Sequence, residues 1–124
     1  MDEIEFYDKV KDFASLKDRE EARKITAAVL KTLAMRLPEA EIEDLKAQLP
    51  LELKDMLKAE KLEKLHYREF IEKIKNEAKL ESFEKAEQCT LAVFRALKQV
   101  VSWGEIEDII AVLPEDLKEL WKNV

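Results

Sequence analysis

The chain has 124 residues and a net charge of −6, which disfavours binding to the phosphate backbone of nucleic acids. A chain of this length buries roughly two-thirds of the surface that it exposes when unfolded, so it can form a hydrophobic core and extensive disorder is excluded. One glycine and three prolines are too few for the turns of an all-β protein, and 40% charged residues suit exposed helices, so we expect an all-α fold.

Four helices are expected in the first half of the chain. In chain order they cover 3–14, a stretch that opens at 18, a stretch that begins near 38, and 51 to about 59. Asp accepts hydrogen bonds from backbone N–H groups at a helix start and proline suits the first helical turn, so the start signals are Asp2, Asp18, Pro38 and Pro50. Four helices are expected in the same order in the second half. They cover 67–79, a stretch that opens at 82, a stretch that begins after 104, and 115–122.

The chain also matches itself at a fixed offset. Shifted by 64 residues, Phe6 to Leu57 aligns with Phe70 to Trp121 without a gap, and 20 of the 52 aligned positions are identical. Such self-similarity is typical of units that cannot bury an apolar face alone. We predict a single domain over 1–124, a compact helical bundle made of two tandem copies of a roughly four-helix unit. The copies cover 3–57 and 67–121, and 58–66 connects them.

The densest shared stretch is acidic, and it aligns Glu41-Ile42-Glu43-Asp44 with Glu105-Ile106-Glu107-Asp108. In each copy the first Glu and the Asp lie three apart, so a helix could present both carboxylates to one divalent cation, which prefers oxygen ligands. The candidate metal ligands are therefore Glu41, Asp44, Glu105 and Asp108. The competing interpretation, which we favour, is that these carboxylates stabilise helix starts and face water, since no His or Asn stands at coordinating spacing nearby.

Two single residues could carry other chemistry. His66 aligns with Asp2 beside the connection, so we expect it to cap a helix or to be exposed rather than to transfer protons. Cys89 aligns with Ile25 on an apolar helical stripe, and we expect a small core residue rather than a nucleophile. No phosphate-binding loop, zinc-binding spacing or nucleophile elbow is present in the sequence, so we predict no catalytic residue and no cofactor.

The differences between the copies give a second candidate site. Five apolar residues of the second copy replace charged or polar residues of the first, namely Phe83, Val100, Trp103, Ile110 and Val112 in place of Arg19, Arg36, Glu39, Lys46 and Gln48. If equivalent positions have similar surroundings, these residues form an exposed apolar patch around Trp103 and Ile110. The alternative, which we favour, is that they fill an asymmetric core together with Trp121. In either case they are the best candidates for a contact with a protein partner or a second copy.

The hydropathy pattern bears on location. No apolar run approaches the roughly 20 residues that a membrane-spanning helix needs. The N-terminal Met1-Asp2-Glu3 is acidic, whereas a secretory signal would be basic. The single cysteine permits no intramolecular disulfide, which fits a reducing compartment. We expect a cytoplasmic protein that binds neither membrane nor nucleic acid.

The repeated pattern resembles a known family. Its parts are an aromatic opener at Phe6 and Phe70, an alanine-rich central helix, and the acidic and Ala-x-Leu-Pro stretches at 41–50 and 105–114. Over nearly the whole chain the pattern is similar to the family catalogued as domain of unknown function 2267. The resemblance implies a small helical prokaryotic protein with two related halves and no established activity, so it supplies no site residues. The chain departs from a uniform pattern at Ala40, where the second copy has Gly104, and at Trp103, which has no aromatic counterpart.

Two functions therefore stay open. The first, which we favour, is a non-enzymatic helical module that binds a protein partner or a second copy through an apolar helix face of the second repeat. The second is a carboxylate- or metal-dependent enzyme that uses the duplicated acidic block. The module requires an exposed apolar surface, whereas the enzyme requires the four carboxylates to converge across the contact between the repeats.

Overall fold

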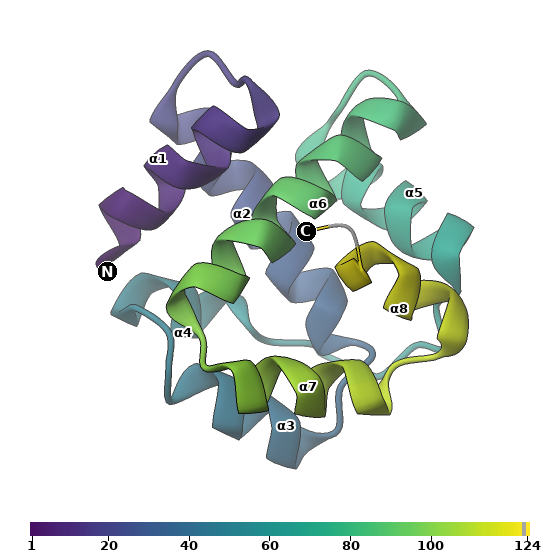
Figure 1. Cartoon of the computed structure of the whole chain (residues 1–124). Helices are drawn as coiled ribbons and strands as arrows, with labels where there is room; N and C mark the ends of the chain where they lie inside the picture. Colours follow the sequence, from purple (N-terminus) through teal and green to yellow (C-terminus); the bar gives the residue numbers. More distant parts are fainter. Residues whose placement is uncertain (123) are drawn as a thin grey trace.

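The computed structural model describes residues 1–122 and 124. Over these residues the chain forms eight α-helices and no β-strand, which confirms the predicted all-α fold (Figure 1). In chain order the helices are α1 (Glu3–Ala14), α2 (Arg19–Ala34), α3 (Glu39–Lys46), α4 (Leu51–Met56), α5 (Tyr67–Ala78), α6 (Phe83–Val100), α7 (Trp103–Val112) and α8 (Glu115–Lys122). None of these eight helices is long and apolar enough to cross a lipid bilayer.

Side-chain caps fix the first two helix starts. Asp2 Oδ1 accepts a hydrogen bond from the backbone N–H of Glu5 at 2.9 Å, and Asp18 Oδ1 accepts one from the backbone N–H of Glu21 at 2.8 Å. Each cap satisfies a donor that has no partner within its helix. The two predicted N-caps are therefore confirmed.

The helices of the two halves begin at matching positions. Each of α1, α2, α3 and α4 begins 64 residues before α5, α6, α7 and α8, respectively. Two predicted bounds are wrong. Helix α7 begins at Trp103 rather than after Gly104, because Ser102 Oγ accepts a hydrogen bond from the backbone N–H of Glu105 at 3.3 Å and caps the helix earlier. Helix α4 ends at Met56 rather than near residue 59.

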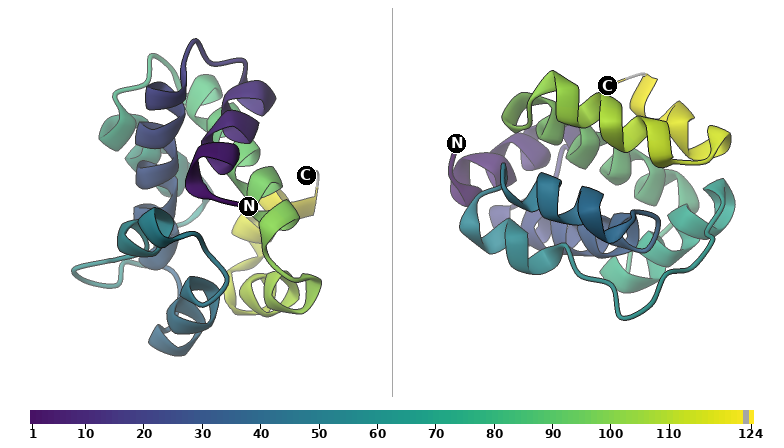
Figure 2. Two further views of the ribbon diagram at one scale, coloured as in Figure 1. Left: turned by 90° about the vertical axis from the view of Figure 1, so that its left-hand side faces the viewer. Right: turned by 90° about the horizontal axis from the view of Figure 1, so that it is seen from below.

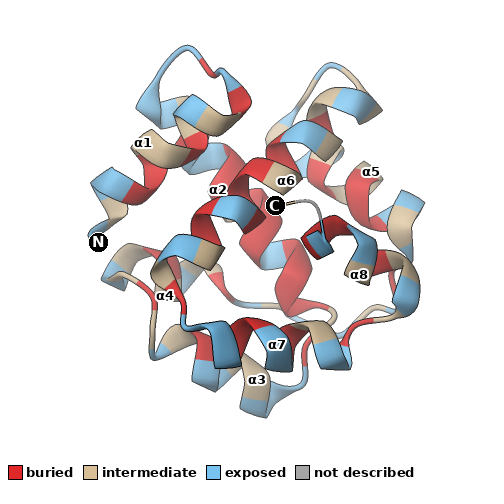
Figure 3. Cartoon of the chain, viewed as in Figure 1, coloured by how far each residue is buried: buried red, intermediate tan, exposed pale blue. Residues whose placement is uncertain are grey.

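The longer helices interlock around the core. Helix α1 packs against both α2 and α6, helix α5 packs against both α6 and α2, and α2 contacts α6 directly. Figure 3 shows buried residues along these central helices, and the aligned pairs Val29 with Val93 and Leu33 with Leu97 are 0% exposed. The opening helix of each half therefore lies against the central helix of both halves.

Aromatic and small residues complete this core. Trp121 of α8 is 1% exposed and stacks on Phe94 of α6, with ring centroids 4.0 Å apart and ring planes at 11°. Cys89 is 0% exposed, so its predicted place in the core is confirmed. The hydroxyl of Thr90 is also buried and donates a hydrogen bond to the carbonyl of Ala86 at 2.8 Å.

The short helices α3 and α7 contact each other away from this crossing. In Figure 1 and in the left view of Figure 2 they lie below the longer helices. Helix α3 buries Leu45, and α7 buries Glu105, Ile106 and Ile109. The contact between α3 and α7 brings the two acidic stretches together.

Candidate functional site

Three carboxylates meet between α3 and α7. One oxygen from each of Glu41, Glu105 and Asp108 lies within 4.8 Å of the other two. Residues three apart share a helix face, so Glu105 and Asp108 project from the same side of α7, and the α3–α7 contact brings Glu41 beside them. The structure thus brings together three of the four predicted metal ligands. The fourth, Asp44, is exposed and lies outside this set.

Glu105 is the buried member of this carboxylate cluster. It is 6% exposed, and its Oε2 has no hydrogen-bond partner among the residues that the structure describes. Glu41 is half-buried, and its Oε2 is likewise buried without a partner in the described part of the chain. The expectation that these carboxylates face water is therefore wrong for Glu105 and correct for Asp44 and Asp108. The reason is that Glu105 lies on the side of α7 that faces Glu41 of α3.

Negative charge accumulates in the cluster, and no side chain among residues 1–122 and 124 forms an ion pair with it. Burial comes first among the causes that raise the pKa of Glu105 to about 7, followed by the charges of Glu41, Asp44 and Asp108. Burial, followed by the charges of Asp108 and Asp44, also raises the pKa of Glu41. Lys46, the basic residue of α3, lies 3.8 Å from Glu43 instead. Both a proton and a metal cation would therefore relieve repulsion at this contact.

The geometry of the cluster suits one class of ligand. Oxygen ligands lie about 2.3–2.6 Å from Ca²⁺, so two ligands on opposite sides of that ion stand roughly 5 Å apart. The separations of at most 4.8 Å fall within this reach. Ligands of Mg²⁺ lie at about 2.0–2.1 Å and would have to stand within roughly 4.2 Å of each other. The three carboxylates are therefore close enough together for one divalent cation to contact them all, and the larger Ca²⁺ makes the smaller demand on their spacing.

The five predicted interaction residues do not form one surface. Phe83 begins α6 and Val100 ends it, so the two lie about 25 Å apart along the helix. Trp103 and Val112 stand at opposite ends of α7, and a spacing of nine residues places them on opposite sides of that helix. Ile110 is half-buried against the core.

The exposure of these residues shows which of them fill the core, as the favoured alternative required, and which do not. Trp103 is 64% exposed and Val112 is 42% exposed, so the expectation that they fill an asymmetric core is wrong for both. Trp121 is buried, as that expectation required. The difference arises because Trp121 projects from α8 onto α6, whereas Trp103 occupies the first turn of α7 with Lys98 Nζ 5.9 Å from its ring centroid.

His66 occupies the N-cap position of α5, as its alignment with Asp2 predicted. Its backbone N–H donates a hydrogen bond to Glu69 Oε1 at 3.1 Å, and its ring Nδ1 lies 3.1 Å from Asp116 Oδ2. The side chain is exposed and links the start of α5 to α8 through Asp116.

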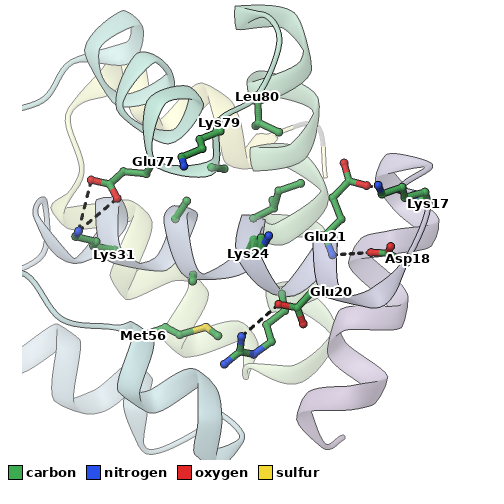
Figure 4. A pocket seen from close by; sticks show the side chains of 15 residues that line it. Lys17, Asp18, Glu20, Glu21, Lys24, Lys31, Met56, Glu77, Lys79 and Leu80 are labelled. Carbon is green, nitrogen blue, oxygen red and sulfur yellow. Dashed lines mark hydrogen bonds and ion pairs between the residues drawn. The ribbon is translucent and has the colours of Figure 1, made fainter.

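Two clefts beside α2 were not predicted from the sequence. The first has a volume of about 810 Å³ and lies between α2 and the C-terminal end of α5 (Figure 4). The second has a volume of about 830 Å³ and lies between α2, α3, α4 and the segment that follows α4. One signal for the first cleft was present in the alignment, since Ala27 in its wall corresponds to the larger Leu91.

Residues 4–120 match a protein family described as an uncharacterized conserved protein (DUF2267). The match includes both acidic stretches and reaches from the first to the last helix. None of the curated proteins compared with the chain matches it. The family description names no reaction, ligand or partner, so the function has to be argued from the geometry.

Proposed function

Because the chain belongs to the DUF2267 family, whose description names no activity, we propose from the α3–α7 contact that it is a non-enzymatic helical module that binds a Ca²⁺-sized divalent cation. The observation that carries this proposal is the Glu105 carboxylate. It is 6% exposed, one of its oxygens has no partner among the described residues, and it lies beside the carboxylates of Glu41 and Asp108.

Charge supports a cation as the ligand. A carboxylate that is buried without a partner destabilises a fold by several kcal/mol unless it is neutralised. Glu105 is such a group, the half-buried Glu41 and the exposed Asp108 stand beside it, and none of the three forms an ion pair with a described residue. A divalent cation would convert their repulsion into attraction between α3 and α7.

Binding is better supported than catalysis. Neither of the two clefts described above is lined by Glu41, Glu105 or Asp108. Neither of these clefts therefore places a substrate against the three carboxylates themselves. Because these two clefts supply no substrate site at the carboxylates, the acidic block supports cation binding better than it supports an enzyme.

We also propose that the protein is one domain of two tandem units, 3–57 and 67–121, joined by 58–66. The common 64-residue offset of the helix starts supports this, as does the packing of each opening helix against both central helices. In this arrangement Glu41 and Glu105 are equivalent residues. The cation would lie between two copies of one acidic motif and would connect the halves.

Calorimetric titration of Ca²⁺ into metal-free protein tests the proposal. One Ca²⁺ is expected to bind per chain, and Mg²⁺ is expected to bind more weakly. Glu105→Gln removes one charged ligand and should lower the affinity at least about tenfold. Glu107→Gln is the matched control, because it removes the same charge from an exposed position of α7 and should leave the affinity unchanged. No saturable binding at millimolar Ca²⁺, or an equal loss in both variants, would contradict the proposal.

A second candidate function is self-association through Trp103. The observation that favours it is the 64% exposure of this indole in the first turn of α7. A stable contact between two copies would have to bury about 1,000 Å² or more. Sedimentation of the wild type and of Trp103→Glu measures this directly: a dimer that becomes a monomer supports the contact, and a wild-type monomer at high protein concentration rules it out.

A further inference from the structure

We infer that a third cleft, between the C-terminal end of α1 and α6, binds a small molecule that carries a carboxylate or phosphate group. This third cleft has a volume of about 390 Å³, which lies in the range of small-molecule sites. Nine residues line it, and the charged side chains among them, those of Lys85 and Arg95, are both cations. The inference is independent of the cation site, because the third cleft and the carboxylate cluster share no residue.

The first cleft, between α2 and α5, provides an internal comparison. Eight of the nine residues that line the third cleft align, at the 64-residue offset, with residues that line the first. Carboxylates and cations are mixed in the first cleft, so its lining favours neither sign of charge. In the third cleft Lys85 aligns with the carboxylate of Glu21, and Phe13 aligns with that of Glu77. The lining of the third cleft therefore favours an anion, although the protein as a whole is acidic.

The exchange of Glu77 for Phe13 changes what the neighbouring cation can bind. In the first cleft Lys31, which aligns with Arg95, is paired with Glu77 at 3.4 Å. The Arg95 guanidinium instead lies over the Phe13 ring, with Cζ 4.2 Å from the ring centroid. The ring attracts the positive charge without accepting a conventional hydrogen bond from the N–H groups. Arg95 can therefore still donate two parallel hydrogen bonds to one carboxylate or phosphate.

The α6 wall of the third cleft carries positive charge at both of its ends. Lys85, Gln88 and Arg95 follow one another along α6, and spacings of three and seven residues place them on one face of the helix. Lys85 is half-buried, and neither it nor Arg95 forms an ion pair with a described residue. Leu91 and Phe13 add apolar surface to the lining. The cleft therefore offers donors to an anionic group and apolar contacts to the body that carries this group.

Val124 also lines the third cleft, and its main-chain oxygen is already held by another cation. Lys98 Nζ donates a hydrogen bond to this oxygen at 2.9 Å and a second one to the carbonyl oxygen of Trp121 at 2.7 Å. Lys98 does not line the cleft itself. The Val124 oxygen thus has a donor of its own, and the donors of Lys85 and Arg95 remain for a ligand.

Two substitutions remove the positive charges and leave the apolar lining intact. They are Arg95→Gln and Lys85→Gln, and both variants should fold because Arg95 is exposed and Lys85 is half-buried. The control for the first is Arg68→Gln, since Arg68 is also exposed and lies over a ring, with Cζ 5.3 Å from the ring centroid of Phe83. The control for the second is Lys75→Gln, which changes a half-buried lysine of α5. Neither control residue lines the third cleft.

Amide chemical shifts during titration with benzoate, phenyl phosphate and benzyl alcohol test the inference on the intact protein. The two anions should shift residues of α6 and of the end of α1, and benzyl alcohol should bind at least about fivefold more weakly because it lacks the charge. Arg95→Gln and Lys85→Gln should each weaken anion binding at least about fivefold, with no change in the controls. The tighter of the two anions identifies the preferred group. No saturable shifts at millimolar anion, equal binding of benzyl alcohol, or equal binding by Arg95→Gln and Arg68→Gln would overturn the inference.

Discussion

Glu105 and Glu107 belong to the same four-residue motif and have opposite surroundings. Side chains two residues apart on a helix point about 200° away from each other, so the Glu105 side chain faces α3 and the Glu107 side chain faces water. Glu105 is 6% exposed, and Glu107 is exposed. The same division holds in α3, where Glu41 is half-buried and Glu43 is exposed. The surroundings of the first Glu in each motif therefore disfavour its charged form.

The unfavourable charge of Glu105 makes the stability of the metal-free protein depend on pH. The pKa of Glu105 is raised from 4.5 to about 7, so between these values the folded state binds more protons than the unfolded state. Stability then falls as pH rises through this window, by roughly 3 kcal/mol in total. Glu105→Gln removes this loss, and in chelator its unfolding free energy should exceed that of the wild type increasingly from pH 5 to 8.

Urea unfolding across this pH range measures the effect, with Glu107→Gln as the control that should follow the wild type. A constant difference between Glu105→Gln and the wild type from pH 5 to 8 would show that Glu105 does not titrate as the structure requires.

At the scale of single elements, α7 and α8 use their tryptophans in different ways. Trp121 is stacked on Phe94 and 1% exposed, whereas Trp103 is 64% exposed. Trp121→Ala should therefore lower the unfolding free energy by about 3–5 kcal/mol, because it leaves a cavity between α8 and α6. Trp103→Ala should change it by no more than about 0.5 kcal/mol. Thermal or urea unfolding of the two variants measures both changes. A large loss of unfolding free energy in Trp103→Ala would contradict the placement of α7.

The elements also show how far the sequence could predict the fold. Helix starts depend on local chemistry, so Asp2, Asp18 and the 64-residue offset were sufficient to predict most of them. The burial of Glu105 depends on which faces of α3 and α7 meet. That is a property of tertiary packing, and a comparison of the aligned residues in the two copies could not predict it. The first cleft was missed for the same reason, since its walls come from both α2 and the end of α5.

At the scale of the whole molecule, the interlocked packing predicts a single unfolding transition. Helix α1 lies against α6 and α5 lies against α2, so neither half can bury its opening helix fully on its own. Both tryptophans belong to the second half, whereas helical circular dichroism reports on the whole chain. The two signals should give the same urea midpoint, as a two-state protein requires. Two separate midpoints would show that the halves fold independently.

The central claim is that a cation joins α3 to α7 through two copies of one acidic motif. A crystal structure of the protein grown with Ca²⁺, with anomalous diffraction to locate the metal, measures this most directly. The predicted result is one Ca²⁺ peak within about 2.6 Å of carboxylate oxygens of Glu41, Glu105 and Asp108. Crystals that show Ca²⁺ only at other acidic residues, with the Glu105 carboxylate still buried and free of metal, would contradict it.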